Sequence, residues 1–476
     1  MANPRLGGKI RRLRRERKLT QTQMAQELGV SPSYLNLIEH NQRPITVAVL
    51  VKLAQRFQIN MESFGDEDDG RLAADLSEAF SDPLFDTHDI TQAELDEMVA
   101  LSPNLGAAVL TLYQAWRGAS GAKAPTDILD GETPAEAGAP SEEVSDFLEQ
   151  RGNYFGFLES AAEGLWREHG LALETLSQDL VKLLASNFAV DVAIEPAERM
   201  GASVREFRPL TRRLLLSELL PPASRTFQLA HQLALLGWRK EIDLAVANYK
   251  FTSDEAMVLA RIALANYFAA ALLMPYERFR EAAKATRYDL TVLEHRFGVS
   301  FEQACHRLTT LRRPGSEGIP FHLIRVDIAG NISKRFGGSG IRIARFGAAC
   351  PRWNVYDAFA TPGMLRIQIS EMPDGGRFFC LSRTVSQPGR NGRFGLFGQR
   401  ASRLAIGLGC ALEHAKEFVH SEGLSLEDPR IVTPIGVSCR LCERVDCSDR
   451  AAPSIHRRLA MDENRRGISA YAMSEK

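Results

Sequence analysis

The stretch that decides the architecture of the N-terminal part is LTQTQMAQELGVSPSYLNLIEHNQRPITVAVLVKLAQRF, residues 19–57. Thr20 is a typical helix N-cap, and Gly29 is a typical residue at a helix end. Ser31-Pro32 then predicts the start of a second helix, because Ser caps and Pro is tolerated at the first helical position. Apolar residues recur at helical spacing in both segments: Met24, Ala25, Leu28, Tyr34, Leu35 and Ile38. The pattern predicts a helix-turn-helix, whose second helix enters the major groove of DNA.

The charges around this motif are unevenly distributed. Residues 1–60 contain eleven Lys and Arg against three Glu, a balance of +8, although the whole chain carries a net charge of only −1. Residues 61–100 contain one Arg and thirteen acidic residues, a balance of −12. Because only the head is basic, the distribution predicts an anionic partner for the head alone.

Composition predicts an ordinary globular protein of several domains. The 476 residues are 45% hydrophobic and 25% charged, and a length of this kind suggests about three domains. The start of the chain lacks the apolar segment of a signal peptide, and we found no uncharged apolar run of membrane-spanning length, so we expect a cytoplasmic protein. Seven cysteines, an odd number in such a large chain, favour reduced thiols or a metal site over a disulfide framework.

Changes in composition divide the remaining chain. Helical periodicity is expected over residues 92–99 and 105–116, and the Gly-, Ala- and Pro-rich residues 118–141 predict a flexible linker. The predicted fold class is mainly α with α+β: an N-terminal helix-turn-helix bundle, a helical ligand domain and a C-terminal α+β domain with a cysteine cluster. The predicted segments are 1–67, 68–140 (helices and linker), 141–315 and 316–476.

Strand and helix patterns follow in both large segments. In the middle segment, residues 189–195 and 212–218 predict short strands, and RTFQLAHQLALL (225–236) predicts a helix. The C-terminal segment predicts alternating strands separated by Gly/Pro turns, followed by one helix over LAIGLGCALEHAKEFV (404–419). The expected strands are FHLIRVDIAG (321–330), GIRIARFG (340–347), MLRIQISEMPDG (364–375) and GRFFCLSRTV (376–385).

A cysteine motif close to the C-terminus predicts a metal site. Cys439, Cys442 and Cys447 have C-x2-C-x4-C spacing, which brings three soft thiolates around one soft metal or cluster. Three thiolates are one short of the usual four, so Cys350, Cys410 or a non-protein ligand would complete the set. An iron-sulfur cluster and zinc both remain open at this point, and free thiols in a loop are the alternative without metal.

Residues 6–64 resemble the phage-repressor-like (Xre) family of helix-turn-helix domains, through the 19–57 stretch quoted above. The resemblance implies two groups of DNA contacts. Phosphate contacts are implied for Gln23, Asn41 and Arg43, and base-edge contacts for Ser33, Tyr34 and Asn36. Phosphate contacts set affinity and register, whereas base-edge contacts set the choice of sequence.

Residues 150–280 resemble the ImmA/IrrE-type zinc peptidases through FQLAHQLALL and LANYFAAALLMP. Such peptidases carry His-Glu-x-x-His on a helix, with two zinc ligands and a glutamate base. The matching positions here are His231, Gln232 and Leu235, and no acidic third ligand precedes Asn266 closely. Gln cannot act as the base and Leu cannot bind a metal, so we expect a ligand-binding scaffold without enzymatic activity. His231 by itself is more typical of a core histidine than of a metal ligand.

The whole chain resembles the family of short-chain fatty acyl-CoA regulators. The matching segments are SPSYLNLIEHNQRPITVAVL, KFTSDEAMVLARIALANYFAAALLMPY, HRLTTLRRP, CPRWNVYDAFATPG, IGLGCALEHA and TPIGVSCRLCE. The resemblance implies a DNA-binding regulator that responds to propionyl-CoA or acetyl-CoA, controls genes of propionate and short-chain carbon metabolism, and holds an iron-sulfur cluster at the C-terminal cysteines. It is expected to be a homodimer or higher oligomer, because two-fold operators need paired heads, with RNA polymerase as a further candidate partner.

The resemblance also implies an effector site in the middle segment. Arg307 is the first candidate for the CoA phosphates, with Arg167, Tyr249 and Lys250 behind it. Phe155 and Phe157 are candidates for the wall of the acyl pocket. A surface charge at Arg307 and ordinary core phenylalanines are the plain alternatives. Two other functions compete with this one: a redox or iron sensor acting through the cysteines, and a peptidase-linked regulator, which Gln232 and Leu235 disfavour.

Overall fold

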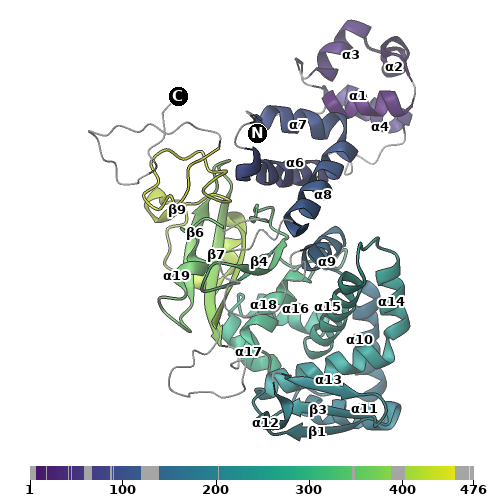
Figure 1. The fold of residues 1–476 in the computed structure, drawn as a ribbon, viewed down its shortest axis with the longest axis vertical. Helices are drawn as coiled ribbons and strands as arrows, with labels where there is room; N and C mark the ends of the chain where they lie inside the picture. Colours follow the sequence, from purple (N-terminus) through teal and green to yellow (C-terminus); the bar gives the residue numbers. More distant parts are fainter. Residues whose placement is uncertain are drawn as a thin grey trace. The chain divides into compact units, whose positions relative to one another are not determined.

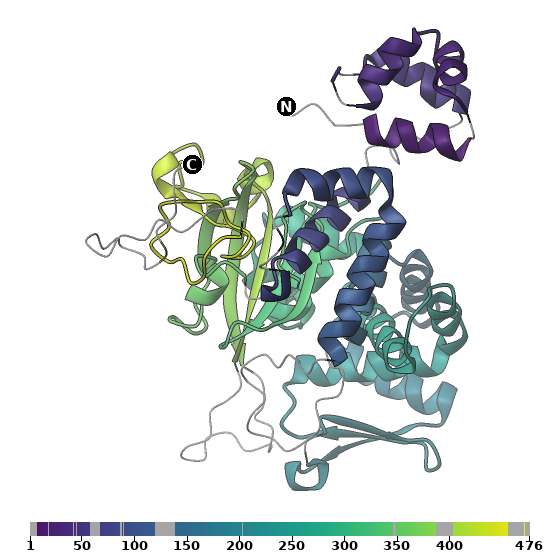
Figure 2. The same cartoon turned by 45° about the horizontal axis from the view of Figure 1, so that its top comes forward.

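The computed structural model describes the chain in segments, and these segments group into two compact units. The described residues are 7–17, 19–40, 42–43, 45–57, 67–85, 88, 90–119, 139–201, 203–345, 349–386, 403–455 and 471. The first unit comprises residues 1–134 and parts of the C-terminal tail, and the second comprises 135–451 and 467–470. The ribbon views of Figures 1 and 2 follow both units from purple to yellow along the chain.

The first four helices of unit 1 form the predicted helix-turn-helix bundle: α1 (Gly7–Glu16), α2 (Gln21–Leu28), α3 (Pro32–Glu39) and α4 (Val47–Phe57). A capping box starts α2, because Thr20 Oγ1 accepts from the Gln23 N–H and Gln23 Oε1 accepts from the Thr20 N–H. Gly29 ends α2 with a left-handed backbone, φ 66°. Ser31 caps α3 as its sequence predicts. Local residue chemistry therefore sets the boundaries of the two central helices.

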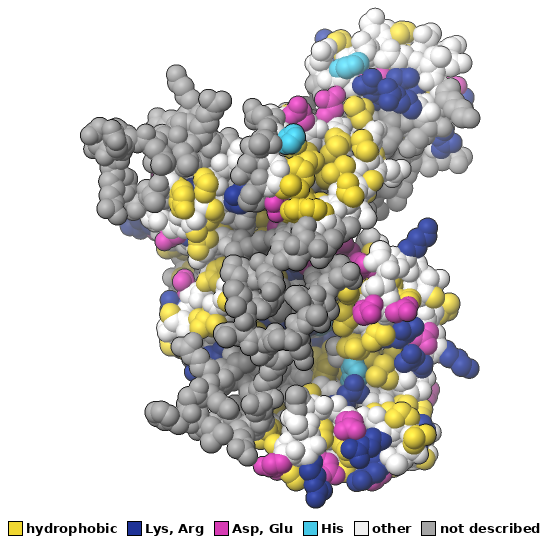
Figure 3. All heavy atoms as spheres, in the orientation of Figure 1, with side chains coloured by type: hydrophobic (Ala, Val, Ile, Leu, Met, Phe, Trp, Pro, Cys, Tyr) yellow, Lys and Arg dark blue, Asp and Glu magenta, His cyan; other side chains and the backbone are white. Residues whose placement is uncertain are grey.

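Three further helices complete the described part of unit 1: α6 (Glu67–Phe80), α7 (Gln92–Leu101) and α8 (Pro103–Ala119), with a 3₁₀ turn, η1 (Pro83–Phe85), between the first two. Helix α1 packs closely on α7 because Gly8 has no side chain: a Cβ there would lie 2.6 Å from Ala100 Cβ. Helices α7 and α8 confirm the helices expected over 92–99 and 105–116. Hydrophobic side chains gather over this part of the surface in Figure 3, and the exposed ones on α8 include Leu105, Leu112 and Trp116.

The helical part of unit 2 surrounds one long central helix, α15 (Asp254–Leu273). By length and composition alone α15 would suit a membrane span, but most of it is buried among its neighbours, as in the core helix of a globular domain. The other helices are α9 (Ala139–Gln150), α10 (Gly156–His169), α11 (Leu176–Phe188), α12 (Ala197–Met200), α13 (Pro222–Gly237), α14 (Arg239–Ala247), α16 (Tyr276–Ala285), α17 (Leu290–Phe297) and α18 (Phe301–Thr309). Helices α9, α10 and α13 pack directly on α15.

A small sheet lies beside α11 and α13 (Figure 1), with strands β1 (Asp191–Glu195), β2 (Arg205–Arg208) and β3 (Arg213–Ser217) in the order β1-β3-β2. Strands β1 and β3 are parallel, whereas β2 runs antiparallel to β3 and forms an edge. The strands predicted at 189–195 and 212–218 are thereby confirmed.

The C-terminal half of unit 2 is a six-stranded sheet in the order β5-β4-β8-β7-β6-β9. Its strands are β4 (His322–Asp327), β5 (Ile332–Gly337), β6 (Arg366–Glu371), β7 (Arg377–Ser386), β8 (Arg403–Ala411) and β9 (Val432–Pro434). Short helical segments join them: α19 (Asn354–Asp357), η2 (Leu412–Glu417), η3 (Val419–Ser421) and η4 (Pro429–Ile431). One face packs with the helices of unit 2 through residues such as Leu323 and Phe379, and the opposite face builds a separate core around Trp353.

Two predictions for the C-terminal segment are wrong. Residues 404–419, expected as one helix, form strand β8 followed by 3₁₀ turns. Strand β8 is central and buried on both faces, so its continuous apolar run does not distinguish strand from helix. The strand expected at 340–347 is irregular over residues 341–345, and β5 lies earlier, at 332–337.

The two large predicted segments share one core. The boundary expected between 315 and 316 lies within unit 2, where a single hydrophobic cluster contains helical residues such as Phe268 and sheet residues such as Phe379. Most of the predicted linker, 120–138, lies outside the described residues, and its two ends belong to α8 and α9.

Candidate functional site

The predicted DNA-contacting side chains that the structure describes lie on α2, on α3 and in the segment that follows α3. Gln23, Ser33, Asn36 and Arg43 are exposed, and Tyr34 is half-buried. The Arg43 guanidinium lies over the Tyr34 ring at 5.7 Å, and Gln21 Nε2 donates to Asn36 Oδ1 at 3.1 Å. Asn41 lies outside the described residues. The structure therefore leaves these side chains accessible and brings Arg43 onto Tyr34, and Lys and Arg side chains gather on the surface of this unit (Figure 3).

A buried ion pair, which sequence reasoning missed, fixes α3 against α1. Arg14 donates to both carboxylate oxygens of Glu39, at 2.6 and 2.9 Å, and Gln21 adds a third hydrogen bond to that carboxylate at 2.8 Å. Burial opposes the charge of Glu39, but the bonds from Arg14 and Gln21 outweigh it and hold the pKa of Glu39 below its ordinary value. Glu39 is the last residue of α3, the helix expected to enter the major groove. The contact with Arg14 therefore sets the orientation of this recognition helix.

The peptidase-like helix α13 is confirmed, and its motif is degenerate. His231 and Gln232 are buried, and Leu235 occupies the position of the second histidine. His231 Nδ1–H donates to Asn266 Oδ1 at 2.9 Å, whereas His231 Nε2 is buried without a hydrogen-bond partner. Arg205, from the edge strand β2, donates to Gln232 Oε1. No described group of three or more His, Cys, Asp or Glu side chains is arranged to hold a metal ion, here or elsewhere.

The structure gathers three of the predicted effector residues into one aromatic cluster, which also contains Phe147, Phe251 and Tyr267. Phe155 lies 5.2 Å from Tyr267, 5.6 Å from Phe147 and 6.3 Å from Phe157 between ring centroids. Tyr249 lies 5.3 Å from Phe147 and 4.6 Å from Phe251. Phe157 is partly exposed, whereas Phe155 is buried. We call these six residues the aromatic cluster.

Cations lie at the rim of the aromatic cluster. Lys250, next to Tyr249 in the chain, is exposed. Arg151, which sequence reasoning missed, is also exposed and lies over the Phe147 ring at 5.5 Å. Its position as a basic residue in the turn directly after α9 could have pointed to it from the sequence. Arg167 lies on α10, where its side chain is exposed and donates to the Glu163 carbonyl.

Arg307 does not lie at this rim, and its predicted contact with CoA phosphates needs correction. Its side chain is fully buried and forms a two-pronged ion pair with Glu159, at 2.5 and 2.9 Å. The guanidinium also donates to the Met274 carbonyl and to Thr310 Oγ1. The Glu159 carboxylate neutralises its charge, and no part of it faces solvent. The predicted surface-charge alternative is excluded by the same burial.

The ion pair acts on the aromatic cluster through Tyr267. The Tyr267 hydroxyl donates to Glu159 Oε1 at 2.7 Å and accepts from the Phe155 N–H at 3.3 Å. Burial, followed by the nearby Glu159 charge, raises the pKa of Tyr267 well above its ordinary value, so the hydroxyl keeps its proton. Arg307 is therefore a positioning residue, because it holds Glu159, which in turn orients Tyr267 against Phe155.

The cysteine loop at residues 437–451 is organised around Arg450. This buried guanidinium donates to the carbonyls of Cys439, Cys442 and Arg444, and the Ala451 N–H donates to Cys439 Sγ at 3.4 Å. Cys439 and Cys447 are partly exposed and Cys442 is buried. The loop brings the three cysteines into one region of the fold, but it does not place them in a ready-made ligand geometry.

Cys350 belongs to the same region. Its N–H donates to the Val437 carbonyl at 3.1 Å. Burial raises the pKa of Cys350, and the nearby thiols of Cys439 and Cys442 contribute in the same direction. Of the two candidates for a fourth ligand, Cys350 is therefore close to the loop, whereas Cys410 lies on β8 within the core that the sheet shares with the helices.

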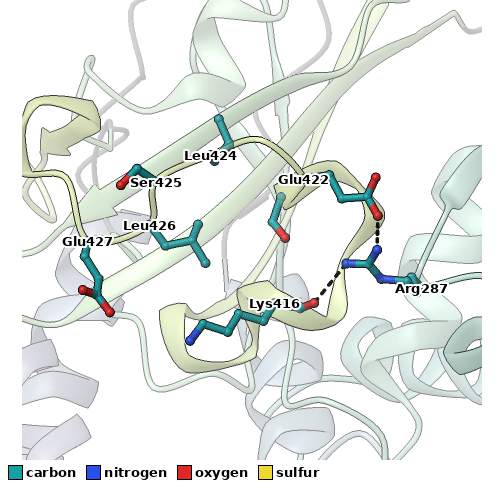
Figure 4. Close-up of a pocket in the computed structure, with 8 residues that line it drawn as sticks. Arg287, Lys416, Glu422, Leu424, Ser425, Leu426 and Glu427 are labelled. Atoms are coloured by element: carbon teal, nitrogen blue, oxygen red, sulfur yellow. Dashed lines mark hydrogen bonds and ion pairs between the residues drawn. The ribbon is translucent and has the colours of Figure 1, made fainter.

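A shallow cavity of about 360 Å³ lies elsewhere in unit 2. Arg287 lines it together with residues from 416 to 427, and the guanidinium contacts Glu422 and the Lys416 carbonyl (Figure 4). Its cations are matched by Glu422 and Glu427, so it offers no excess positive charge to an anionic ligand. None of the predicted site residues lines it.

A helix-turn-helix with an exposed recognition face, joined to a degenerate peptidase-like domain, defines a DNA-binding transcription regulator. Comparisons with known families match three parts of the chain: a helix-turn-helix model matches residues 10–64, the IrrE N-terminal-like domain matches 185–309, and "Short-chain fatty acyl coenzyme A regulator, C-terminal" matches 310–471. The chain belongs to the family of short-chain fatty acyl coenzyme A regulators.

Three curated relatives span almost the full chain. The chain is 40% identical over 478 residues to the HTH-type transcriptional regulator PrpR of Mycobacterium tuberculosis, covering 98% of this chain and 96% of the relative. It is 40% identical over 481 residues to RamB of the same organism, covering 100% of both. It is 39% identical over 468 residues to the propionyl-CoA carboxylase regulator of Cereibacter sphaeroides, covering 98% of both.

A solved structure has the same fold over most of the chain. It is described as a Mycobacterium tuberculosis transcriptional regulator, is 41% identical and superposes with a TM-score of 0.66. The match covers 70% of this chain and 99% of that one.

Proposed function

We propose that this regulator changes its DNA binding when the aromatic cluster binds a short-chain acyl-CoA, such as propionyl-CoA or acetyl-CoA. The observation that carries the proposal is the convergence of Phe155, Phe157 and Tyr249 with exposed cations at Lys250 and Arg151. Acyl-CoA recognition requires an apolar contact for the acyl end and cations for the phosphates. The family name and the printed name of the Cereibacter relative support the same effector class.

The regulated genes, on this proposal, serve propionate and short-chain carbon metabolism, and the regulator acts in the cytoplasm, where its DNA lies. A homodimer supplies the two heads that a two-fold operator needs. We infer that the chain has no peptidase activity, because Gln232 and Leu235 replace the base and a ligand of the zinc motif.

Calorimetry on the full chain tests the effector. We expect propionyl-CoA to bind more tightly than free CoA, and selectivity among acetyl-, propionyl- and butyryl-CoA to be shallow, because one methylene contributes only about 1–3 kcal/mol. Arg151→Ala and Lys250→Ala are each expected to weaken binding about tenfold through a lost charge-assisted contact. Lys284→Ala, at an exposed lysine on α16, is the matched control. Binding of no acyl-CoA below the millimolar range would refute the proposal.

The effect on DNA is measured with an operator that the protein itself selects from random duplexes. Anisotropy titrations with and without propionyl-CoA should give different affinities, and Tyr249→Ala should remove the difference while leaving the affinity without effector unchanged. Equal affinities in the wild type, despite calorimetric binding, would separate ligand binding from regulation and reject the regulatory step.

We further propose that Cys350, Cys439, Cys442 and Cys447 hold an iron-sulfur cluster. Four soft thiolates suit such a cluster, and Cys350 lies close to Cys439 and Cys442. When bound, the cluster would supply one-electron redox chemistry, and the second candidate function, a redox or iron sensor, depends on it. Anaerobically purified protein should contain iron and sulfide, and each Cys→Ser change should remove both, whereas Cys410→Ser should not. Zinc without iron would reject the cluster and keep the site.

A further inference from the structure

An unusual charge lies where the zinc peptidases hold their metal. Arg205 is half-buried beside Gln232 on the degenerate helix α13, and no described carboxylate forms an ion pair with it. Burial lowers the pKa of Arg205, and no acidic neighbour opposes that effect. A guanidinium removed from water without a counter-ion is costly, so an arginine of this kind is typical of an anion site.

Five other partly or fully buried arginines in unit 2 face a carboxylate: Arg307 with Glu159, Arg313 with Glu163, Arg325 with Glu302, Arg345 with Asp146 and Arg383 with Glu294. The buried Arg450 is held by three backbone carbonyls. At each of these six positions a carboxylate or several backbone carbonyls surround the guanidinium, whereas the described side-chain partner of Arg205 is the neutral Gln232 amide. No described carboxylate neutralises the Arg205 charge, so a bound ligand would have to supply the negative charge.

A second, independent feature lies next to Arg205. Because Asn266 Oδ1 accepts from His231 Nδ1–H, the proton is fixed on Nδ1, and His231 Nε2 is left with a lone pair. This nitrogen is buried and has no hydrogen-bond partner, and His231 as a whole is only 3% exposed. Burial and then the Arg205 charge lower the pKa of His231 to about 4, so the ring is neutral at physiological pH. An unpaired buried acceptor calls for a ligand N–H or O–H.

A metal ion does not fit this arrangement. His231 is a single nitrogen ligand, Leu235 offers no lone pair, and the Arg205 guanidinium repels a cation. The site suits an anion instead, because the Arg205 cation lies close to the lone pair of His231 Nε2, the atom that would bind zinc in a peptidase. Gln232, whose Oε1 accepts from Arg205, keeps its amide N–H groups as further donors toward an anion.

We propose that Arg205, His231 and Gln232 form a binding site for a small carboxylate that carries a neighbouring hydroxyl, the 2-hydroxycarboxylate class. The carboxylate binds the guanidinium and the glutamine amide, and the hydroxyl donates to His231 Nε2. This site lies apart from the aromatic cluster, since Asn266 and Tyr267 project from different sides of α15 toward His231 and Glu159 respectively. It is a second effector site and does not depend on the proposed acyl-CoA site.

Calorimetry on the full chain with L-lactate, propionate and inorganic phosphate tests the proposal. Lactate should bind about tenfold more tightly than propionate, because propionate lacks the hydroxyl for His231 Nε2; tenfold corresponds to about 1.4 kcal/mol. His231→Leu should abolish this preference and leave propionate binding unchanged. Phosphate binding without lactate binding would overturn the assignment to a hydroxycarboxylate.

Gln232→Glu is the decisive variant, because it adds a carboxylate beside Arg205 instead of removing a group. The new ion pair should raise the thermal midpoint of the protein and abolish lactate binding, since the site then carries its own anion. Arg205→Gln should also abolish lactate binding, and Arg199→Gln, at a surface arginine paired with Glu195, should leave it unchanged. Lactate binding that is equal in Gln232→Glu and wild type, or that is absent from the wild type in the millimolar range, would overturn the proposal.

Discussion

The ion pair between Glu159 and Arg307 allows a quantitative test of how unit 2 is stabilised. Glu159→Gln keeps the shape of the side chain but removes its charge, and it leaves the fully buried Arg307 guanidinium uncompensated. Breaking a buried pair in this way costs about 3–5 kcal/mol of folding free energy, most of it from the remaining unpaired charge. Tyr267→Phe removes one hydrogen bond to the carboxylate and should cost less, about 1.5–3 kcal/mol.

Hydrogen exchange of the α15 amides, measured on the full chain, reports this cost within unit 2. A loss of 3–5 kcal/mol lowers protection by about two to four orders of magnitude, provided that exchange follows unfolding of the unit. Glu206→Gln is the matched control, because the Glu206–Arg208 pair is exposed to solvent and its loss should leave the protection of α15 unchanged.

The double replacement Glu159→Met with Arg307→Met completes the test. It removes both charges together, so we expect much of the stability lost in Glu159→Gln to return. If Glu159→Gln lowers protection by less than tenfold, or if the double replacement is as unstable as the single one, then the uncompensated charge is not the cause, and the reasoning is wrong.

Three further predictions concern other parts of the fold. Burial holds the pKa of His322 at about 3, below its unfolded value of about 6.5. The stability that neutral His322 contributes is therefore present above about pH 6.5 and is lost as the pH falls from there toward 3. His322→Gln should make the free energy of unfolding depend less on pH in denaturant titrations, and an unchanged pH dependence would contradict this prediction. Glu39→Gln should weaken binding to all DNA sequences alike, because the loss of the Arg14 contact loosens the recognition helix; loss of sequence preference alone would argue against this role. Gly409→Ala should destabilise unit 2 by about 1–3 kcal/mol, because its Cβ would lie 2.4 Å from the His322 ring, whereas Gly164→Ala, on open helix surface, should be neutral or stabilising in the same urea titration.

The sequence predicted the helix-turn-helix accurately because its boundaries depend on neighbouring residues. Thr20, Gly29 and Ser31 each act within three or four positions of themselves. The C-terminal sheet was harder to predict, because strand β8 is defined by its partners β4 and β7 and by burial on both faces. Its run of apolar residues carries neither the alternation of a half-buried strand nor the clear periodicity of a surface helix.

The candidate sites show the same difference between features set by neighbouring residues and features set by residues far apart in the chain. The aromatic residues proposed for the effector site and the cysteine spacing could be picked out in the sequence, because each is a short pattern or a family segment. The burial of Arg307 was not, since its partner Glu159 is 148 positions away in the chain. The charge at Arg205 was missed for a similar reason: it lies on a strand, 27 positions before the helix residue that it contacts.

One contiguous series of contacts joins the proposed effector site to the six-stranded sheet, which lies beside the turn that follows Cys350. Phe155 contacts Tyr267, Tyr267 contacts Glu159, and Glu159 holds Arg307 on α18, which packs against β4. Strand β4 begins at His322, whose row across the sheet continues through Gly409 and Cys380 to Gln368.

The row ends at Gln368, which contacts the turn that follows Cys350. Gln368 Nε2 donates to the Arg352 carbonyl, and its Oε1 accepts from the Asn354 N–H, so it fixes the turn that follows Cys350. Contact alone does not establish coupling, which requires an element with two states that both ligands bias. The turn after Cys350 is the element at which this series of contacts would act, because it is held from one side by the sheet and from the other by the loop that contains Val437. Coupling between the two proposed sites would therefore require this turn to adopt a second state when a ligand binds at the aromatic cluster, and by reciprocity a ligand at the cysteines would then change the affinity for that first ligand by the same factor.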